Sequence, residues 1–377
     1  MFEIYGKYTS ATVYSDICDA EATSQIYGLC NHPIFEGASI KIMPDVHSGV
    51  GCTVGTTIKA QRRAVIPSVV GSDIGCGVLS VRFKRKSDID YAALDRFISG
   101  NIPFGMSIRP SRHKRLDKKV REDIEQIADD LKMYRSKEDF VRSVGSLGGG
   151  NHYIEIGNTR EGYMLSIHTG SRSIGKCVAK YFTDLADKYV TEKGLCGFDR
   201  SMPYIEEELY DLYVTQMLRA SAAAAENRRL IAADILEFLG AEATESFDTV
   251  HNYIEVARDG SLIIRKGAVS AKAGEGLAIP LNMRDGIIIA EGLGNPEWNF
   301  SAPHGAGRLL SRREAKERLN LAEFEREMSG IVSFSVGRST LDESPMAYKP
   351  PEEILSVIGD TVRICEIVKP LYNFKAH

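Results

Sequence analysis

The residues best suited to chemistry in this chain are histidines, a carboxylate and a thiol in glycine-rich or strand-like surroundings. Four of the 8 histidines follow this pattern: His152 in GGGNHYIEI, His168 in LSIHTGSRS, His251 in TVHNYIE and His304 in SAPHGAGR. Asp73 and Cys76 stand close together in the glycine-bounded turn VVGSDIGCGV. Imidazole, carboxylate and thiolate are ligands of divalent transition metals. One such histidine alone is more often a core residue, but the whole set predicts a metal site in which Cys76 can bridge two ions.

His304 has different neighbours from the other three histidines. Pro303 precedes it and Gly305-Ala306-Gly307-Arg308 follows it, so the ring has space and a guanidinium nearby. Backbone amides beside glycines and an arginine suit a phosphate. Neutral imidazole is also a competent nucleophile toward phosphorus. The pattern favours a phosphate-binding or nucleophilic histidine over the alternative, a tight glycine turn with a capping histidine.

The segment GSLGGGNHYIEI, residues 145–156, places three glycines directly before a strand-like run. Glycine lets the backbone approach a non-protein group closely. We therefore expect this loop to contact phosphate, with Asn151 supplying amide hydrogen bonds and His152 directed at a metal from the start of a strand. Glu155 follows on the same strand, where a surface carboxylate is the simpler alternative.

The composition is that of an ordinary globular protein. The chain has 377 residues, of which 43% are hydrophobic and 26% charged, with a formal net charge of −4. The net charge predicts no global attraction to nucleic acid, although basic runs at 82–86, 109–121 and 308–318 could provide it locally. The 7 cysteines form no CxxC pair and indicate no disulfide framework. No apolar run approaches the roughly 20 residues that span a bilayer, and the start lacks a signal pattern, so we expect a cytoplasmic protein.

The secondary-structure patterns predict a single domain, residues 1–377, of mixed α and β structure. Strands are expected in most of the first hundred residues, including one directly before Asp73, and again after residue 240. Apolar spacing predicts helices near 117–132, over most of 176–240 with a stop at Gly240, from about 311, and near 352–366. Asp259-Gly260 is expected to be a hairpin turn. The interpretation is an α/β (α+β) fold with a β-sheet core, flanking helices and a helical excursion near 176–240.

Seven blocks of this sequence resemble, in order, the signature blocks of the RtcB-type RNA-splicing ligases. They are MPDVHSGVG (43–51), GSDIGCGV (71–78), LGGGNHYIEI (147–156), SIHTGSRSIG (166–175), VHNYIE (250–255), RKGA (265–268), and PHGAGR (303–308) followed by SRREA (311–315). The ending YNFKA resembles the lysine-bearing C-terminus of the family. The resemblance implies an RtcB-like fold and a ligase that uses GTP and manganese. Such a ligase joins RNA with a 2′,3′-cyclic phosphate or 3′-phosphate to RNA with a 5′-hydroxyl, through a histidine–GMP intermediate.

The resemblance also implies a role for each metal-binding candidate. Cys76 matches the thiolate that bridges two Mn²⁺ ions. His168 and His251 would complete the protein ligands of one ion. Asp73 and His152 would complete those of the other ion, beside the GTP phosphates.

The same resemblance implies the catalytic and nucleotide-binding residues. His304 matches the histidine that attacks the α-phosphorus of GTP, and Asp45 matches the carboxylate that orients its ring. The implied GTP contacts are Asn151 at a phosphate, Gly305 and Ala306 beside the histidine, Glu155 and Lys375 at the guanine edge, and Tyr348 near the base.

One block departs from the family pattern. Where a PGSMG-like turn is expected near the guanine pocket, the chain reads IPLNMRDG at 279–286, with Asn282 in place of a serine and added charge from Arg284-Asp285. This departure and the short chain suggest a divergent branch of the family. Such a branch would act in RNA repair or tRNA splicing. A release-factor-like partner accompanies some such branches. Two other functions remain open: a binuclear phosphodiesterase or phosphatase that uses no nucleotide, and a catalytically idle RNA-binding protein.

Overall fold

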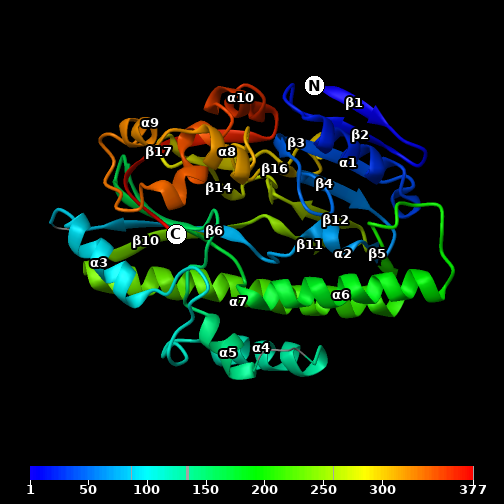
Figure 1. Ribbon diagram of the computed structural model, residues 1–377, viewed down its shortest axis with the longest axis horizontal. Helices are drawn as coiled ribbons and strands as arrows, with labels where there is room; N and C mark the ends of the chain where they lie inside the picture. The colour runs from blue at the N-terminus through cyan, green and yellow to red at the C-terminus, as the bar shows by residue number, and fades with distance from the viewer. Residues whose placement is uncertain (86, 133–135, 258, 377) are drawn as a thin grey trace.

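Two β-sheets form the centre of the molecule (Figure 1). The computed structural model describes residues 1–85, 87–132, 136–257 and 259–376. The six-stranded sheet contains, in spatial order, β1 (Phe2–Tyr5), β2 (Ser10–Val13), β3 (Ser39–His47), β4 (Val54–Ala60), β12 (Leu262–Lys266) and β11 (Asn252–Val256). The seven-stranded sheet contains β10 (Glu242–Val250), β6 (Gly77–Lys84), β8 (Gly162–Thr169), β7 (Tyr153–Thr159), β17 (Val362–Lys375), β15 (Gly286–Gly292) and β14 (Gly276–Asn282).

Strand pairing in both sheets is mainly antiparallel. All pairs of the seven-stranded sheet are antiparallel, and the six-stranded sheet has one parallel pair, β2 with β3. Two short ladders join other segments: β13 (Ala268–Ser270) with β16 (Ser301–Pro303), and β5 (Ala64–Val65) with β9 (Ile205–Glu206). Sheets and helices together confirm the predicted mixed α and β class.

The register of the seven-stranded sheet determines where three of the sequence blocks meet. His168 of β8 is paired with Val78 of β6 on one side and with Tyr153 of β7 on the other. Cys76 directly precedes β6 and His152 directly precedes β7. These antiparallel pairings therefore put the three blocks at one end of the sheet.

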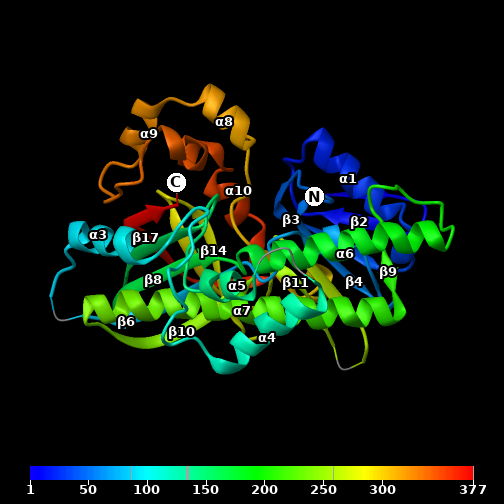
Figure 2. The ribbon, with the colours of Figure 1, turned by 60° about the horizontal axis from the view of Figure 1, so that its bottom comes forward.

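Long helices lie along one side of the two sheets (Figures 1 and 2). The α-helices are α1 (Ala20–Cys30), α2 (Pro67–Val70), α3 (Tyr91–Asn101), α4 (Lys118–Asp130), α5 (Lys137–Ser143), α6 (Ser173–Glu192), α7 (Glu207–Leu239), α8 (Arg312–Arg318), α9 (Leu321–Glu327) and α10 (Pro351–Leu355). Short 3₁₀ helices occupy Pro33–Phe35, Pro296–Trp298, Arg338–Glu343, Pro345–Ala347 and Ile358–Asp360. Within the described residues, no helix combines the length and apolar character needed to cross a membrane.

Helix α7 contacts β6 and β8 of one sheet and β11 of the other, so it supports both sheets. Glu207 and Glu208 in its first turn complement the positive end of the helix dipole. Gly240 ends it in a left-handed conformation, with φ 58° and ψ 37°. The predicted stop at Gly240 is thereby confirmed.

Several sequence predictions are confirmed with changed boundaries. The helix predicted near 117–132 is α4, and the helical stretch at 176–240 is the pair α6 and α7 with β9 between them. The helix expected from about 311 is divided into α8 and α9, because Asn320 caps a new helix start. The predicted hairpin joins β11 to β12. Asp259 and Gly260 lie in that connection, where the Asp259 carboxylate accepts from the Ser261 amide.

Three predictions were wrong. No strand directly precedes Asp73, since Pro67 opens the helical turn α2 there, in a position that suits proline. The helix at 352–366 ends at Leu355, because the chain beyond it pairs with β15 as part of β17. The strand-rich reading of the first hundred residues missed α1 and α3, although each begins at an aspartate N-cap, Asp19 and Asp90.

Candidate active site

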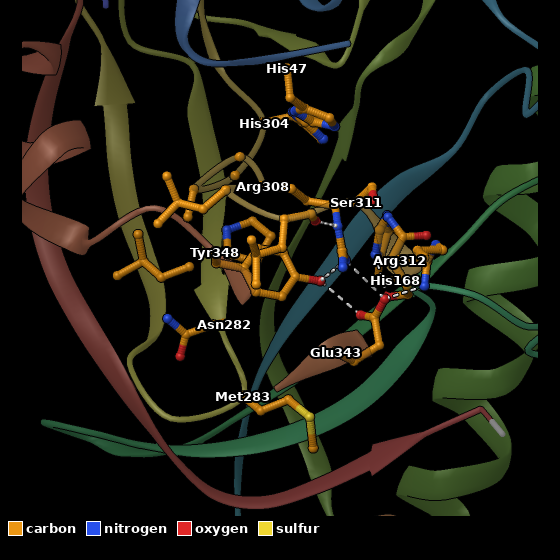
Figure 3. A pocket seen from close by; sticks show the side chains of 18 of the residues that line it. His47, His168, Asn282, Met283, His304, Arg308, Ser311, Arg312, Glu343 and Tyr348 are labelled. Carbon is orange, nitrogen blue, oxygen red and sulfur yellow. Dashed lines mark hydrogen bonds and ion pairs between the residues drawn. The ribbon is translucent and has the colours of Figure 1, made fainter. Parts of the chain in front are cut away.

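A cavity of about 940 Å³ opens beside the seven-stranded sheet and includes His304, His168 and Glu155 in its wall. Its lining comes from β7, β8, β14, β17, the loop after β16 and the 3₁₀ helix Arg338–Glu343. Figure 3 shows His304 beside His47 at one end, and Tyr348, Arg312 and Glu343 grouped further along. The cavity therefore has an end rich in imidazoles and a second end rich in ionic side chains.

Four other side chains surround the sulfur of Cys76. Its Sγ lies 3.6 Å from Nε2 of His152 and 3.4 Å from Nε2 of His168. Nε2 of His152 is also 3.1 Å from Oδ2 of Asp73. The ligand atoms of Cys76, His168 and His251 lie within 4.8 Å of one another, and so do those of Asp73, Cys76 and His152. The structure thus brings the five predicted metal residues into two adjacent groups that share one sulfur.

The donor set of this cluster fits a pair of divalent ions. Burial is the main reason that the pKa values of His168 and His251 lie well below the usual range, and nearby imidazoles contribute. Neutral imidazole is the form that binds a metal. Burial, with the Asp73 charge, also raises the pKa of Cys76 well above its usual value. A coordinating cation is what would keep this buried sulfur as a thiolate.

Helix α7 fixes the loops that carry these ligands. The buried Arg228 guanidinium donates to the backbone carbonyls of Gly75, at 2.9 Å, and Thr169, at 2.7 Å. Its other nitrogens form a bidentate pair with Asp248, both distances being 2.6 Å. The neighbouring Asn227 side chain accepts from the Gly145 amide at 2.7 Å. Two consecutive residues of one helix therefore hold three separate loops around the cluster.

Two glycines allow these loops to approach one another. Gly148 has φ 86°, and a β-carbon there would collide with the Arg172 guanidinium and lie 2.8 Å from Nδ1 of His152. A β-carbon at Gly170 would collide with the carboxylate of Asp73. Gly148 is thus required by close packing within the protein. The expected contact of the triple-glycine loop with phosphate stays a prediction.

His304 is held by a buried carboxylate. Its Nδ1 lies 2.6 Å from Oδ2 of Asp45, and the same oxygen accepts from the backbone amides of His304, at 3.0 Å, and Gly305, at 3.2 Å. The ring centroid of His304 is 4.8 Å from that of His251. Because Asp45 orients the ring from behind, the other ring nitrogen, Nε2, is the one left for a ligand beside the metal cluster.

Other residues keep the Asp45 and His304 pair in place. The buried ammonium of Lys349 donates to the carbonyl of Pro44, next to Asp45, at 2.9 Å. Nδ1 of His47 donates to the backbone carbonyl of Asp45, 2.9 Å away, and burial lowers the pKa of His47 to about 4. Sequence reasoning did not single out Lys349 or His47. The PDVH block that contains His47 was the available signal.

The second end of the cavity is an ionic network centred on Glu343. Its carboxylate accepts from Lys375 at 2.7 Å and from the Tyr348 hydroxyl at 2.8 Å, and it pairs with Arg312 at 2.5 Å. Burial alone would raise the pKa of Glu343, but Lys375 and Arg312 hold it at about 2. The Arg308 guanidinium lies 5.1 Å from the centre of the Tyr348 ring. Glu343 carries no sequence signal, because its importance arises only from these contacts.

Glu155 lines the same cavity, opposite Asn373 of β17. It is only 3% exposed, so the alternative of a surface carboxylate is wrong. Burial raises the pKa of Glu155 to about 8, against the lowering influence of a hydrogen bond from Asn373 and the charge of Lys375. A raised carboxyl pKa in a cavity is typical of a functional group.

All six expected nucleotide-binding residues line this one cavity. They are Asn151, Glu155, Gly305, Ala306, Tyr348 and Lys375. Two of these residues also make contacts within the protein that the sequence did not predict. The Gly305 amide donates to Asp45, and Lys375 pairs with Glu343.

The divergent turn at 279–286 also reaches the cavity, through Asn282. Asn282 donates to the Asp285 carboxylate at 2.7 Å, and that carboxylate pairs with Arg284. The charges that this turn adds are therefore largely compensated within it.

Comparison with known proteins shows the family of this chain. Residues 25–376 match the family described as tRNA-splicing ligase RtcB. The chain belongs to the RtcB family. The RNA-splicing ligase RtcB of Escherichia coli (strain K12) is 30% identical, over 92% of each chain. The tRNA-splicing ligase RtcB of Aeropyrum pernix is 27% identical, over 84% of this chain and 83% of the relative. That of Thermococcus kodakarensis is 26% identical, over 85% and 83%. Membership in the RtcB family therefore extends over nearly the whole chain, including all the site residues named above.

Proposed function

We propose that this protein is a GTP-dependent RNA ligase that joins 3′-phosphate or 2′,3′-cyclic phosphate ends to 5′-hydroxyl ends, in RNA repair or tRNA splicing. Membership in the RtcB family supports RNA ligation and splicing. The observation that carries the finer proposal is the pairing of His304 with the buried Asp45 beside the cysteine–histidine cluster. This arrangement suits a histidine that acts on a phosphorus atom.

The hydrogen bond to Asp45 determines which nitrogen of His304 reacts. A carboxylate only accepts, so Nδ1 carries the proton and Nε2 has the free lone pair. We propose that Nε2 attacks the α-phosphorus of GTP. The new N–P bond forms as the bond from that phosphorus to the pyrophosphate oxygen breaks. Asp45 then stabilises the positive charge that develops on the ring.

Asp73, Cys76, His152, His168 and His251 would hold two Mn²⁺ ions. When bound, the ions would supply positive charge that offsets the negative charge developing on the phosphates. The neutral state of His168 and His251 keeps the cluster ready for cations, because protonated imidazoles would repel them.

The remaining cavity residues support nucleotide binding. Tyr348 is fixed by Glu343, so its ring offers a rigid surface near a base. Lys375 and Glu155 present a cation and an acceptor toward the guanine edge, and Asn151 lies at the cavity wall near the cluster. We assign Gly305 and Ala306 to the phosphate region because they follow His304 directly.

Ligation then follows in two transfers. The terminal 3′-phosphate oxygen of RNA attacks the phosphorus held by His304, and the N–P bond breaks to free the ring. The 5′-hydroxyl of the second RNA attacks the activated 3′-phosphorus, closes the phosphodiester and expels GMP. A 2′,3′-cyclic phosphate must first be opened by water. The names of the three relatives mention splicing and no release factor, so a release-factor-like partner is not part of this proposal.

A labelling experiment tests this function. Purified protein incubated with Mn²⁺ and α-labelled GTP should acquire acid-labile label, and His304→Ala should abolish it. His113→Asn is a matched control, because His113 contacts Asp234 in a separate cavity and asparagine can still donate to that carboxylate. Wild-type protein that cleaves RNA ends but takes no label would favour the nucleotide-independent phosphodiesterase instead.

A further inference from the structure

The base-recognition end of the cavity contains a residue that the mechanism above does not use, Asn373 of β17. Asn373 and Glu155 are directly opposed in the β17–β7 pair, so their side chains extend from the same face. The Asn373 side-chain amide donates to Oε2 of Glu155 at 2.8 Å. Both residues line the cavity and are 1% and 3% exposed. They therefore form one buried pair in the cavity wall.

This hydrogen bond uses only half of each side chain. Because the carboxylate accepts, the amide nitrogen of Asn373 must face it and the amide oxygen must face elsewhere. Within the described part of the chain, neither Oε1 of Glu155 nor Oδ1 of Asn373 has a hydrogen-bond partner. Buried acceptors without partners are unfavourable and uncommon in native proteins. Two of them side by side at a cavity wall are suited to a ligand that presents two adjacent donors.

Guanine has such an edge, because its N1–H and its exocyclic 2-amino group are neighbouring donors. Adenine has an acceptor at N1 and no amino group at C2, so it would place an acceptor against Glu155. Hypoxanthine keeps N1–H but lacks the 2-amino group. A site that offers two acceptors thus distinguishes all three bases. Binding of adenine or hypoxanthine is disfavoured because it leaves a buried acceptor unpaired.

We propose that Asn373 is a specificity-determining residue for guanine: its Oδ1 accepts from the 2-amino group while Oε1 of Glu155 accepts from N1–H. This rests on the proposed function only in taking a guanine nucleotide as the occupant of the cavity. The ionised carboxylate is the accepting form that N1–H requires. Burial raises the pKa of Glu155 to about 8, and the hydrogen bond from Asn373 and the charge of Lys375 oppose that rise.

The test is equilibrium binding of GMP and IMP to the full chain in Mn²⁺, measured by calorimetry. Wild type should bind GMP at least about tenfold more tightly than IMP, the effect of one buried acceptor gaining its donor. Asn373→Ala should weaken GMP binding until the GMP:IMP ratio is about one, while IMP binding changes little. Asn158→Ala is the matched control, because Asn158 belongs to the same strand pair but is exposed. It should keep the wild-type ratio.

Two results would overturn the proposal: equal GMP and IMP affinities in wild type, which needs no variant, or an unchanged ratio in a folded Asn373→Ala protein. The proposal is supported if Asn373→Ala loses the preference for GMP over IMP while Asn158→Ala keeps it. Failure of this proposal is distinguishable from failure of the ligase function. Protein that takes label from GTP on His304 but does not discriminate IMP contradicts only the role of Asn373. Protein that discriminates IMP but takes no label contradicts only the ligase chemistry.

Discussion

The two ends of the active-site cavity are built in different ways. At the metal end, Arg228 and Asn227 of α7 hold the ligand-bearing loops through backbone groups, and the polar atoms of these two side chains all have partners within the protein. At the base end, two buried acceptors in the wall, on Glu155 and Asn373, have no partner among the residues that the structure describes. The metal end is therefore organised before any ligand arrives, whereas the base end is completed by what binds there.

The largest effect is expected at the shared sulfur. Cys76→Ala should lower Mn²⁺ affinity by more than about 100-fold, since losing a ligand should exceed the 10- to 100-fold effect of losing a supporting group. Elemental analysis of the purified variant reports the metal content. Cys177→Ala is the control, because Cys177 is a buried cysteine packed in the hydrophobic core around α6. Metal content equal to wild type in Cys76→Ala would contradict the bridging sulfur.

A supporting residue should have the next largest effect. Arg228→Lys keeps the charge but lacks the planar fork that reaches Asp248 and two carbonyls together. We expect Mn²⁺ affinity to fall by about 10- to 100-fold, and GMP affinity without metal to change by less than about threefold. Metal titration and calorimetry measure the two quantities.

The adjacent residue provides the control for that substitution. Arg229 is half-exposed and pairs with Glu226, so Arg229→Lys should leave both affinities near wild type. If Arg228→Lys reduced metal and nucleotide binding equally, the two ends of the cavity would not be separately built.

A selectivity change is expected at the base end. Glu155→Ala removes the acceptor assigned to N1–H, so GTP should lose its advantage over ATP by about tenfold or more. The measurement is the rate of His304 labelling by each nucleotide in competition. Unchanged discrimination between GTP and ATP would show that Glu155 does not contact the base.

The smallest effect is on stability. Burial raises the pKa of Glu155 from 4.5 to about 8, so the unfolded chain releases this proton at lower pH than the folded protein does. Between these values the folded state binds more protons, and its stability relative to the unfolded state therefore decreases as pH rises. The Glu155→Gln variant does not lose stability in this way, because glutamine does not ionise. Without nucleotide, its Tm should exceed that of wild type by a larger margin at about pH 8.5 than at about pH 5.

A conservative change at the surface controls for the loss of a carboxylate in general. Glu36→Gln replaces an exposed side chain and should shift Tm by the same small amount at both pH values. A pH-independent difference between Glu155→Gln and wild type would contradict the burial of an ionisable group at the base end.

The sequence was sufficient to identify the residue types of the site but not its supports. The five metal candidates stood out because they occur in glycine-rich or strand-like stretches, and His304 stood out by its small neighbours. Arg228 and Asn227 did not, since a polar residue within a long helix gives no sign of the loops it will hold. Glu343 and Lys349 were missed because their roles arise only from tertiary contacts.

The local sequence signals for secondary structure differ in strength along the chain. The aspartate caps of α1 and α3 were available at Asp19 and Asp90 and were outweighed by the nearby Val and Ile runs. The change from helix to strand after Leu355 had no comparable local sign, because pairing with β15 decides it.

What the sequence determined by itself is chemical: a set of imidazoles, one thiol and carboxylates, with glycines where loops must pack closely. Tertiary structure alone decided that residues 76, 168 and 251 converge, because that depends on the antiparallel register of β10, β6 and β8. It also decided the protonation of the site, since burial keeps the imidazoles of His168 and His251 neutral. The opposition of Asn373 and Glu155 follows from one cross-strand pairing between segments more than two hundred residues apart, a contact to which no local pattern contributes.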